Sequence, residues 1–124
     1  MKHNRDFIEL CEQALMTVKE VTLIDVQHYL EKKKALVIDV REDHEWDKGH
    51  IAGAQHLGRG ILERDIVNLC QDKDTCIVLY CGGGYRSALS AQSLKMMGYK
   101  NVLSMQGGMR AWREAGLPVA NDEL

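Results

Sequence analysis

Several features that mark particular classes of protein are missing from the sequence. No apolar run approaches the roughly 20 residues that a membrane-spanning helix needs. The first residues lead into an acidic, periodic segment rather than the apolar core of a signal peptide. There is one proline, Pro118, and there is no internal repeat, low-complexity stretch or linker. We therefore expect one compact unit in the cytoplasm that does not bind a membrane.

The four cysteines also lack a metal-binding or disulfide pattern. They stand at positions 11, 70, 76 and 81, with no Cys-x-x-Cys pair and no histidine at zinc-finger spacing. Free thiols in a reducing compartment fit this arrangement, so we expect neither a metal nor another cofactor. The 124 residues suffice for a core, and the 45% hydrophobic and 27% charged fractions are those of ordinary globular domains.

Acidic residues are absent from one long segment of the chain. No Asp or Glu occurs from Cys81 to Arg113, although the whole chain has 18 of them against 16 Lys and Arg. Five cations lie in this acid-free segment: Arg86, Lys95, Lys100, Arg110 and Arg113. Such an asymmetry suggests that the segment binds an anion, while chance and a solvated helix face explain the charges equally well. The basic residues are too few and too scattered for a nucleic-acid site.

The hydrophobic pattern predicts alternating helices and strands. Apolar residues three and four positions apart predict an N-terminal helix over residues 5–19. Short β-branched runs predict buried strands at 20–24, 35–40, 76–80 and 101–105. Further helices are expected at 26–33, with Asp25 as its cap, and at 42–48, 61–70, 86–97 and 109–115. This alternation is typical of an α/β fold with a central parallel sheet, whose ligands bind beyond the carboxyl ends of the strands.

The segment from Cys81 to Arg86 carries the strongest functional pattern. It leaves a buried strand, passes through a cysteine and three glycines, and enters a helix. Consecutive glycines let the backbone curl so that several N–H groups face one centre, and the helix start adds more of them. Together with the cationic fork of Arg86, such surroundings favour the thiolate, the nucleophilic form of Cys81. The alternative is an inert buried cysteine, which is how we interpret the other three cysteines.

Four residues separate Cys81 from Arg86. Five intervening residues form the phosphate-binding loop of cysteine-dependent phosphatases and related arsenate reductases. The shorter ring suits a sulfur atom attached to the cysteine better than a phosphoryl group. The segment from 81 to 113 also lacks an acidic residue that would protonate a leaving group.

From about Val21 to Val119 the sequence resembles the rhodanese family of sulfurtransferases. The loop from Cys81 to Arg86 is similar to that family's pattern of Cys, two variable residues, Gly, one variable residue and Arg. Other landmarks follow in order: Ile38-Asp39-Val40-Arg41 with Glu45-Trp46, then Gly49-His50-Ile51-Ala52-Gly53-Ala54, Gln106-Gly107-Gly108-Met109-Arg110-Ala111-Trp112 and Gly116-Leu117-Pro118-Val119. Ala52 and His56 depart from the family, which usually has Pro and Asn at these positions.

The resemblance implies a rhodanese-like α/β fold with a five-stranded, mostly parallel sheet flanked by helices. We expect a helical extension at residues 1–20 and the rhodanese-like domain at 21–124. The implied catalytic residue is Cys81, which accepts sulfane sulfur as a persulfide from a thiosulfate-like anion and passes it to a thiol or cyanide. The expected substrate-binding residues are Gly82, Gly83, Gly84, Tyr85 and Arg86, with Tyr85 exposed at the tip of the loop.

Two other hypotheses about function stay open at this point. The protein could be a persulfide carrier or docking module that a protein partner loads, with little activity toward small donors, or it could be a phosphatase or arsenate reductase.

Among the other polar landmarks, Asp39 and Arg41 are expected to pair with each other, with Glu45 or with the backbone. We expect a structural role for His50, hydrogen-bonded to a loop carbonyl, and core positions for Trp46 and Trp112.

Overall fold

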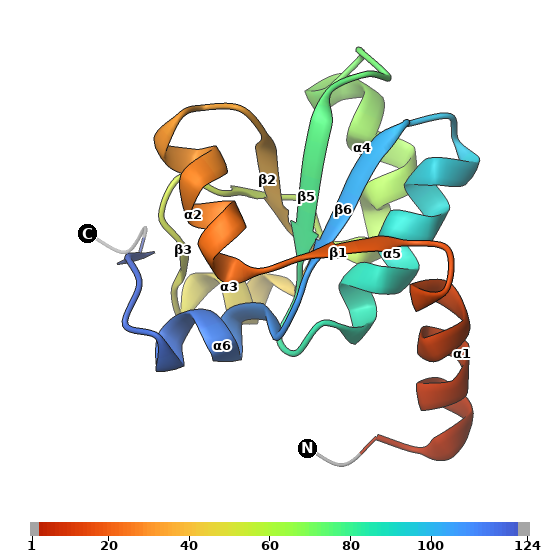
Figure 1. Ribbon diagram of the computed structural model, residues 1–124, viewed down its shortest axis with the longest axis horizontal. Helices are drawn as coiled ribbons and strands as arrows, with labels where there is room; N and C mark the ends of the chain where they lie inside the picture. Colours follow the sequence, from red (N-terminus) through yellow and green to blue (C-terminus); the bar gives the residue numbers. More distant parts are fainter. Residues whose placement is uncertain (1–2, 122–124) are drawn as a thin grey trace.

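The computed structural model describes residues 3–121 and has a five-stranded parallel sheet at its centre (Figure 1). The strand order is β1-β6-β5-β2-β4. The strands are β1 (Lys19–Val21), β6 (Asn101–Met105), β5 (Cys76–Tyr80), β2 (Leu36–Asp39) and β4 (Gln55–His56). A separate antiparallel pair joins β3 (His50–Ile51) to β7 (Val119–Ala120). The predicted α/β class with a parallel five-stranded sheet is confirmed.

Helices cover both faces of this sheet. They are α1 (Arg5–Leu15), α2 (Leu23–Glu31), α3 (Asp43–Asp47), α4 (Leu62–Leu69), α5 (Tyr85–Met96) and α6 (Gly108–Glu114), with a 3₁₀ turn at Arg59–Ile61. Alternate residues of the buried strands point to opposite faces. Ile38 and Leu79 join a cluster with α4 and α5, whereas Val37 and Val78 pack with α2 and α6. The central strands are therefore apolar on both sides, as their continuous hydrophobic runs require.

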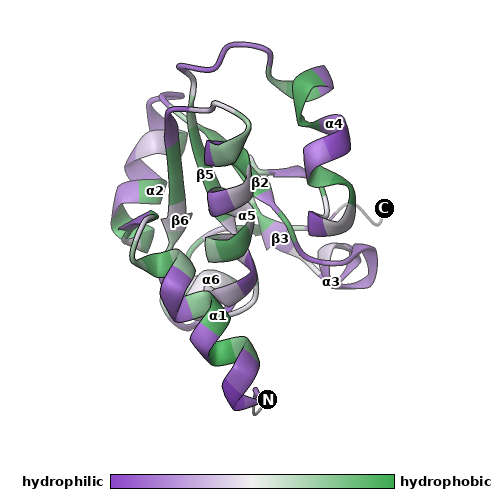
Figure 2. Cartoon of the chain, turned by 90° about the vertical axis from the view of Figure 1, so that its right-hand side faces the viewer, coloured by the Kyte–Doolittle hydropathy of each residue, from purple (hydrophilic) through white to green (hydrophobic). Residues whose placement is uncertain are grey.

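The predicted N-terminal helix is present and packs against α5, but it ends at Leu15, and Lys19, its expected last residue, begins β1. The Asn4 side chain caps α1 by accepting a hydrogen bond from the N–H of Phe7 at 2.8 Å. Cys11 and Ala14 are fully buried in a cluster with Ala88 of α5. Figure 2 shows α1 at one end of the molecule, with hydrophobic and hydrophilic residues interspersed along it. The apolar side of α1 is thus the contact that fixes the helix to the domain.

Two boundaries near the start of the domain differ from the prediction. The first strand ends at Val21, and Thr22 rather than Asp25 caps α2. The hydroxyl of Thr22 accepts from the N–H of Asp25, and the carboxylate of Asp25 accepts from the N–H of Thr22, both at 3.2 Å. In such a reciprocal box the acidic residue is the third residue of the helix, so the helix begins three residues earlier than we expected.

Three very short strands, β3, β4 and β7, were not predicted because two residues carry too little pattern to be recognised. No helix within residues 3–121 is long and apolar enough to cross a membrane. The carboxyl ends of β2, β5 and β6 lie at the same edge of the sheet, since all three strands are parallel neighbours. Cys81 follows β5 at this edge, and α6 begins just after β6.

Candidate active site

Cys81 comes directly after the last residue of β5, and its sulfur is held by the backbone of the loop that follows. The Cys81 Sγ accepts hydrogen bonds from the N–H groups of Gly84, at 3.1 Å, and Ser87, at 3.3 Å. Gly84 has φ +106°, a conformation that a side chain at this position would disfavour. Two N–H donors on one sulfur stabilise negative charge there, so the loop is suited to hold a thiolate.

Ser87 is a contact of the sulfur that the sequence analysis missed. Its hydroxyl lies 3.5 Å from the Cys81 Sγ and 2.8 Å from the hydroxyl of Ser104 on β6. The signal was nevertheless present, because Ser87 is the third residue of α5 and the first N–H groups of a helix have no partner inside it. One of these N–H groups, that of Ser87, donates to the Cys81 Sγ.

The start of α6 holds the same loop from the outside. The N–H of Met109 donates to the carbonyl of Cys81 at 2.7 Å, and the N–H of Arg110 donates to the carbonyl of Gly82 at 3.1 Å. A Cβ atom at Gly108 would lie 2.4 Å from the Cys81 carbonyl oxygen. Gly108 is therefore needed for the close approach of α6. The pair of glycines after a predicted strand was the available signal, although we had assigned it no role.

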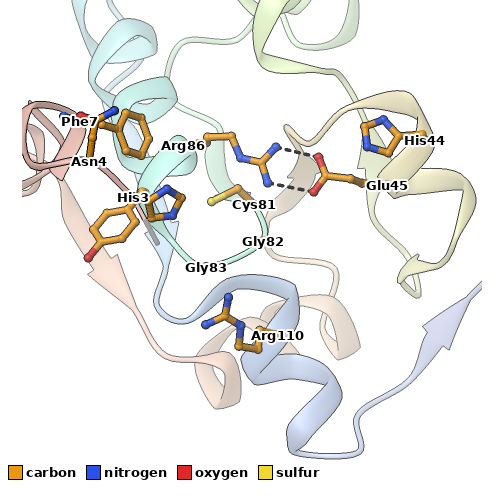
Figure 3. A pocket seen from close by; sticks show the side chains of 11 residues that line it. His3, Asn4, Phe7, His44, Glu45, Cys81, Gly82, Gly83, Arg86 and Arg110 are labelled. Carbon is orange, nitrogen blue, oxygen red and sulfur yellow. Dashed lines mark hydrogen bonds and ion pairs between the residues drawn. The ribbon is translucent and has the colours of Figure 1, made fainter. Parts of the chain in front are cut away.

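Arg86 directs its guanidinium at Glu45 of α3 (Figure 3). The two side chains form a bidentate ion pair with N···O distances of 2.7 and 3.0 Å. Hydrogen bonds from Arg86 favour the carboxylate and lower the pKa of Glu45 to about 2, and the same pairing raises the pKa of Arg86. We had expected this fork to face a bound oxyanion. It instead ties the loop to α3, and its contact with a substrate stays a prediction.

A cavity of about 710 Å³ opens in front of Cys81. It brings together five of the six predicted site residues: Cys81, Gly82, Gly83, Tyr85 and Arg86. The sixth, Gly84, contributes its N–H to the sulfur. The cavity also has lining residues that the sequence analysis did not assign to a site, namely His3, Asn4, Phe7, His44, Glu45 and Arg110.

Tyr85 is not an exposed residue at the tip of the loop. It is half-buried as the first residue of α5, and its ring meets the ring of Phe7 edge-on with 6.1 Å between centroids. The reason is that α1 lies over the start of α5 and covers a side chain that the loop alone would leave exposed.

Asp39 and Arg41 form a buried ion pair at the neighbouring strand end, as expected. The Arg41 guanidinium lies 2.7 Å from the Asp39 carboxylate and also donates to the carbonyl of Gly49 at 2.8 Å. The hydroxyl of Tyr80 accepts from the N–H of Ile51 at 3.0 Å, and burial followed by the charge of Asp39 raises its pKa. These contacts tie β2, β3 and β5 together and leave no group directed at the cavity.

Two histidines enclose Trp46. Its ring is stacked on His50 with 3.4 Å between centroids and on His56 with 4.9 Å, and the Nδ1 of His50 lies 3.4 Å from the Trp46 carbonyl oxygen. The structural role of His50 is confirmed. The prediction that Trp46 is a core residue was wrong, since it is only half-buried, whereas Trp112 is 1% exposed. His56, a departure from the family pattern, lies 2.8 Å from the carbonyl of Arg41.

The four cysteines are free thiols, and burial, followed by the charge of Cys81, raises the pKa of Cys11. Within residues 3–121 no group of three or more His, Cys, Asp or Glu side chains is placed to hold a metal ion. Of the four cysteines, Cys81 is the one that lines the cavity.

A parallel α/β sheet with a cysteine loop at its carboxyl edge defines a class of protein, and comparison with known families gives that class a name. The model of the rhodanese-like domain matches residues 19–115, so the chain belongs to the rhodanese family. This confirms the resemblance found in the sequence. The match omits α1, which precedes its first residue.

Relatives with named functions support sulfur transfer in general. The thiosulfate sulfurtransferase GlpE of Coxiella burnetii is 30% identical over 98 residues, which cover 79% of this chain and 90% of GlpE. YrkF of Bacillus subtilis, named as a candidate sulfur carrier, is 31% identical over 97 residues, or 77% of this chain. The chain spans 51% of YrkF.

Two solved structures match nearly the whole chain. The matched part is longer than residues 19–115, which the family model covers. RPA3614 of Rhodopseudomonas palustris, a protein of unknown function described as a possible tyrosine phosphatase, has a TM-score of 0.86 and 30% identity over 97% of this chain and 98% of its own. The polysulfide-sulfur transferase homodimer of Wolinella succinogenes has a TM-score of 0.80 and 26% identity, covering 95% of this chain and 89% of its own. The rhodanese-like fold is thus shown by both sequence and structure.

Proposed function

We propose that this protein is a sulfurtransferase in which Cys81 carries sulfane sulfur as a persulfide. The sulfur comes from a donor such as thiosulfate and passes to a thiophilic acceptor, a thiol or cyanide. The observation that carries the proposal is the position of the Cys81 Sγ at a cavity, with the N–H groups of Gly84 and Ser87 directed at it. Because these two donors favour negative charge on the sulfur, we assign no general base to its attack.

The proposed cycle has two displacements. The Cys81 thiolate attacks the outer sulfur of thiosulfate, the sulfur–sulfur bond of the donor breaks, and sulfite leaves with the bonding electron pair. An acceptor nucleophile then attacks the outer sulfur of the persulfide, and the electron pair of the broken bond returns to the Cys81 Sγ. Charge develops on this sulfur at the end of the cycle, where the two N–H groups are already in place to stabilise it.

The remaining predicted site residues receive roles from their contacts. Gly82 and Gly83 line the cavity and keep the approach to the sulfur open, because neither carries a side chain. Arg86 holds the start of α5 against α3 through Glu45, and lines the path of the incoming anion. Tyr85 forms part of the cavity wall beside Phe7.

Phosphate hydrolysis is supported less well by the same cavity. Such a reaction needs an acid that protonates the leaving group, and among the described residues Glu45 is the acidic one that lines the cavity. With a pKa of about 2 and both oxygens bound to Arg86, Glu45 is ionised at neutral pH and has no proton to give.

A persulfide carrier is the second candidate function, because the relative YrkF is named as a candidate sulfur carrier. The two functions share the Cys81 persulfide and differ in what loads it. The test is the intact mass of the protein after incubation with thiosulfate and removal of small molecules, for the natural chain, Cys81→Ser and the control Cys76→Ser.

We expect a gain of one sulfur atom in the natural chain and in Cys76→Ser, and no gain in Cys81→Ser. Cys76 is a suitable control because it is half-buried at the far end of β5, away from the cavity. Loading by a protein persulfide but not by thiosulfate would favour the carrier. A gain that persists in Cys81→Ser would contradict both functions.

A further inference from the structure

The cavity in front of Cys81 is larger than a small inorganic anion requires. Its volume of about 710 Å³ lies in the range of roughly 300–1,000 Å³ that is typical of sites for organic ligands. Three of its lining residues, His3, Asn4 and Phe7, belong to α1 or to the residues just before it. The N-terminal helix, which lies outside the matched family model, therefore forms part of the wall.

One wall of the cavity is aromatic. The ring of His3 lies 5.1 Å from Phe7 and 5.3 Å from Tyr85, and Phe7 lies 6.1 Å from Tyr85, so each ring contacts the other two. The cluster joins α1 to the first residue of α5, directly after the cysteine loop. Because Cys11 and Ala14 anchor α1 in the buried cluster with α5, the wall is fixed in place.

The cavity also has a cation whose charge no described residue neutralises. Arg110 is exposed, lines the cavity and has no hydrogen-bond or ion-pair partner for its guanidinium among residues 3–121. Figure 3 shows this guanidinium directed toward Gly82 and Gly83, while that of Arg86 is engaged by Glu45.

The three remaining cations of the acid-free segment have partners away from the cavity. Lys95 donates to the carbonyl of Thr17, Arg113 donates to the carbonyl of Lys48 at 3.1 Å, and Lys100 lies 3.6 Å from the carboxylate of Asp74. In the described part of the chain, Arg110 is thus the cation of this segment that is left to bind an anion in the cavity.

We propose that the cavity binds an organic thiol that bears a carboxylate and an apolar body. Its carboxylate pairs with Arg110, its body packs on His3, Phe7 and Tyr85, and its sulfur faces Cys81. This inference rests on the proposed sulfur transfer and names the substrate class of that site. Cyanide or thiosulfate alone would leave the aromatic wall without a contact, whereas an apolar body removes the ring surfaces from water.

The chemical step is balanced without any further reactant. The thiolate of the bound compound attacks the outer sulfur of the Cys81 persulfide, a new sulfur–sulfur bond forms, and the bond to the Cys81 Sγ breaks. The electron pair stays on the Cys81 Sγ as a thiolate, and the bound compound leaves as a persulfide. Since the step is reversible, the same cavity holds the compound when it acts as acceptor and when its persulfide acts as donor.

The test uses the full chain, loaded with thiosulfate and freed of excess donor, in single-turnover transfer to matched thiols. For Arg110 the pair is 3-mercaptopropionate and 2-mercaptoethanol, which differ in the carboxylate. For the aromatic wall the pair is 2-benzyl-3-mercaptopropanoate and 3-mercaptopropionate, which differ in the phenyl ring. Each preference is a ratio within one variant, so a loss of folded protein affects both members equally.

We expect Arg110→Gln to lower the preference for the carboxylate thiol about tenfold, the effect of one charge-assisted hydrogen bond. Phe7→Ala should lower the preference for the benzyl compound by a similar factor. The matched controls keep both preferences: Arg113→Gln on the same helix, whose guanidinium faces Lys48, and Leu10→Ala on α1, which is half-exposed outside the cavity.

Unchanged ratios in Arg110→Gln and Phe7→Ala, with persulfide still loaded, would overturn the inference and leave the proposed function intact. The same holds if these variants alter only transfer to a protein acceptor, because the cavity would then serve a macromolecule. A chain that takes up no sulfur in the mass measurement would instead contradict the proposed function with thiosulfate. Phe7→Leu, which keeps the apolar volume of α1, provides a second variant if Phe7→Ala fails to fold.

Discussion

The ends of β2 and β5 are neighbours in the sheet, with Asp39 paired in register with Tyr80, yet they are built differently. At the end of β2, the buried charges of Asp39 and Arg41 satisfy each other, and Arg41 also donates to a backbone carbonyl. At the end of β5, the buried Cys81 receives N–H groups on its sulfur while facing a cavity. The carboxyl edge of the sheet thus holds a structural ion pair and a reactive cysteine. The charged groups of the pair have only protein groups as partners, whereas the cysteine also faces the cavity.

The largest effect on stability should come from breaking the buried ion pair of Asp39 with Arg41. Asp39→Ala leaves the Arg41 charge buried without its partner, and we expect the free energy of unfolding to fall by about 3–5 kcal/mol. Asp43→Ala is the control, because Asp43 is 96% exposed in its side chain and lies 3.7 Å from His56. It should cost less than about 1 kcal/mol. Urea denaturation measures both, and equal losses would remove the special role of the β2 end.

Gly108→Ala should disturb the loop that carries Cys81, because Gly108 allows α6 to approach that loop closely. The new Cβ would meet the Cys81 carbonyl at 2.4 Å in a backbone conformation with φ +58°. Gly116→Ala introduces the same kind of strain, φ +69°, with no atom within 4 Å of the Cβ. We expect about 2–4 kcal/mol of destabilisation for Gly108→Ala and about 1 kcal/mol for Gly116→Ala.

Slower sulfur loading should accompany the change at Gly108 alone. Loading rates measured by intact mass in the folded fraction of each variant separate the two effects. If Gly116→Ala slows loading as much as Gly108→Ala does, the contact between α6 and the loop is not what matters.

The Glu45–Arg86 pair should make the free energy of unfolding depend on pH. The pKa of Glu45 is lowered from 4.5 to about 2 in the folded state, so its stabilisation is complete above pH 4.5 and is lost as the pH falls through about 2. At neutral pH we expect Glu45→Gln to lower the free energy of unfolding by about 1–2 kcal/mol, allowing for solvent screening.

Acid titration of stability checks this, since the natural chain and Glu45→Gln should converge toward pH 2. The control is Asp65→Asn, which breaks the exposed pair of Asp65 with Arg64 at the same 2.7 Å distance. The quantity to compare is the difference in unfolding free energy between the natural chain and each variant. If this difference depends on pH as strongly for Asp65→Asn as for Glu45→Gln, the placement of Glu45 at the loop adds nothing.

The smallest effect should be that of a single hydroxyl. Ser87→Ala keeps the N–H on the Cys81 sulfur but removes the contact with Ser104, and should cost about 1 kcal/mol and slow loading several-fold. Ser90→Ala, three residues along α5, removes a buried hydroxyl that has no hydrogen-bond partner within the described chain. We expect that variant to be neutral or slightly more stable in thermal unfolding, and a loss equal to that of Ser87→Ala would contradict the assignment.

Much of the fold was predictable because its signals are local. The apolar runs around Val37 and Val78 are continuous, as buried parallel strands require, and they lie in the centre of the sheet. The pairing of Asp39 with Arg41 was also accessible, since the two side chains are two positions apart. The start of α2 was misplaced because Asp25 fits both the cap and the third residue of a helix, and the sequence alone does not separate these roles.

Parts of the candidate site could not be predicted, because they join segments far apart in the chain. Glu45 lies 41 positions from Arg86, and nothing in either segment indicates the bidentate pair. The contact of Phe7 with Tyr85 depends on how α1 seats on α5. Arg110 was one of five cations in the acid-free segment, and it differs from the others in lining the cavity without a partner among the described residues.

The sequence by itself determined the alternating α/β pattern and the cysteine loop, because hydrophobic periodicity and consecutive glycines act on neighbouring residues. The tertiary structure alone decided which of the charged groups neutralise one another and which face the cavity. It paired Arg86 with Glu45, left Arg110 without a partner among the described residues, and placed the start of α1 at the cavity of Cys81. The physical reason is that ion pairing and burial depend on distances in space, which are set by the packing of whole helices on the sheet.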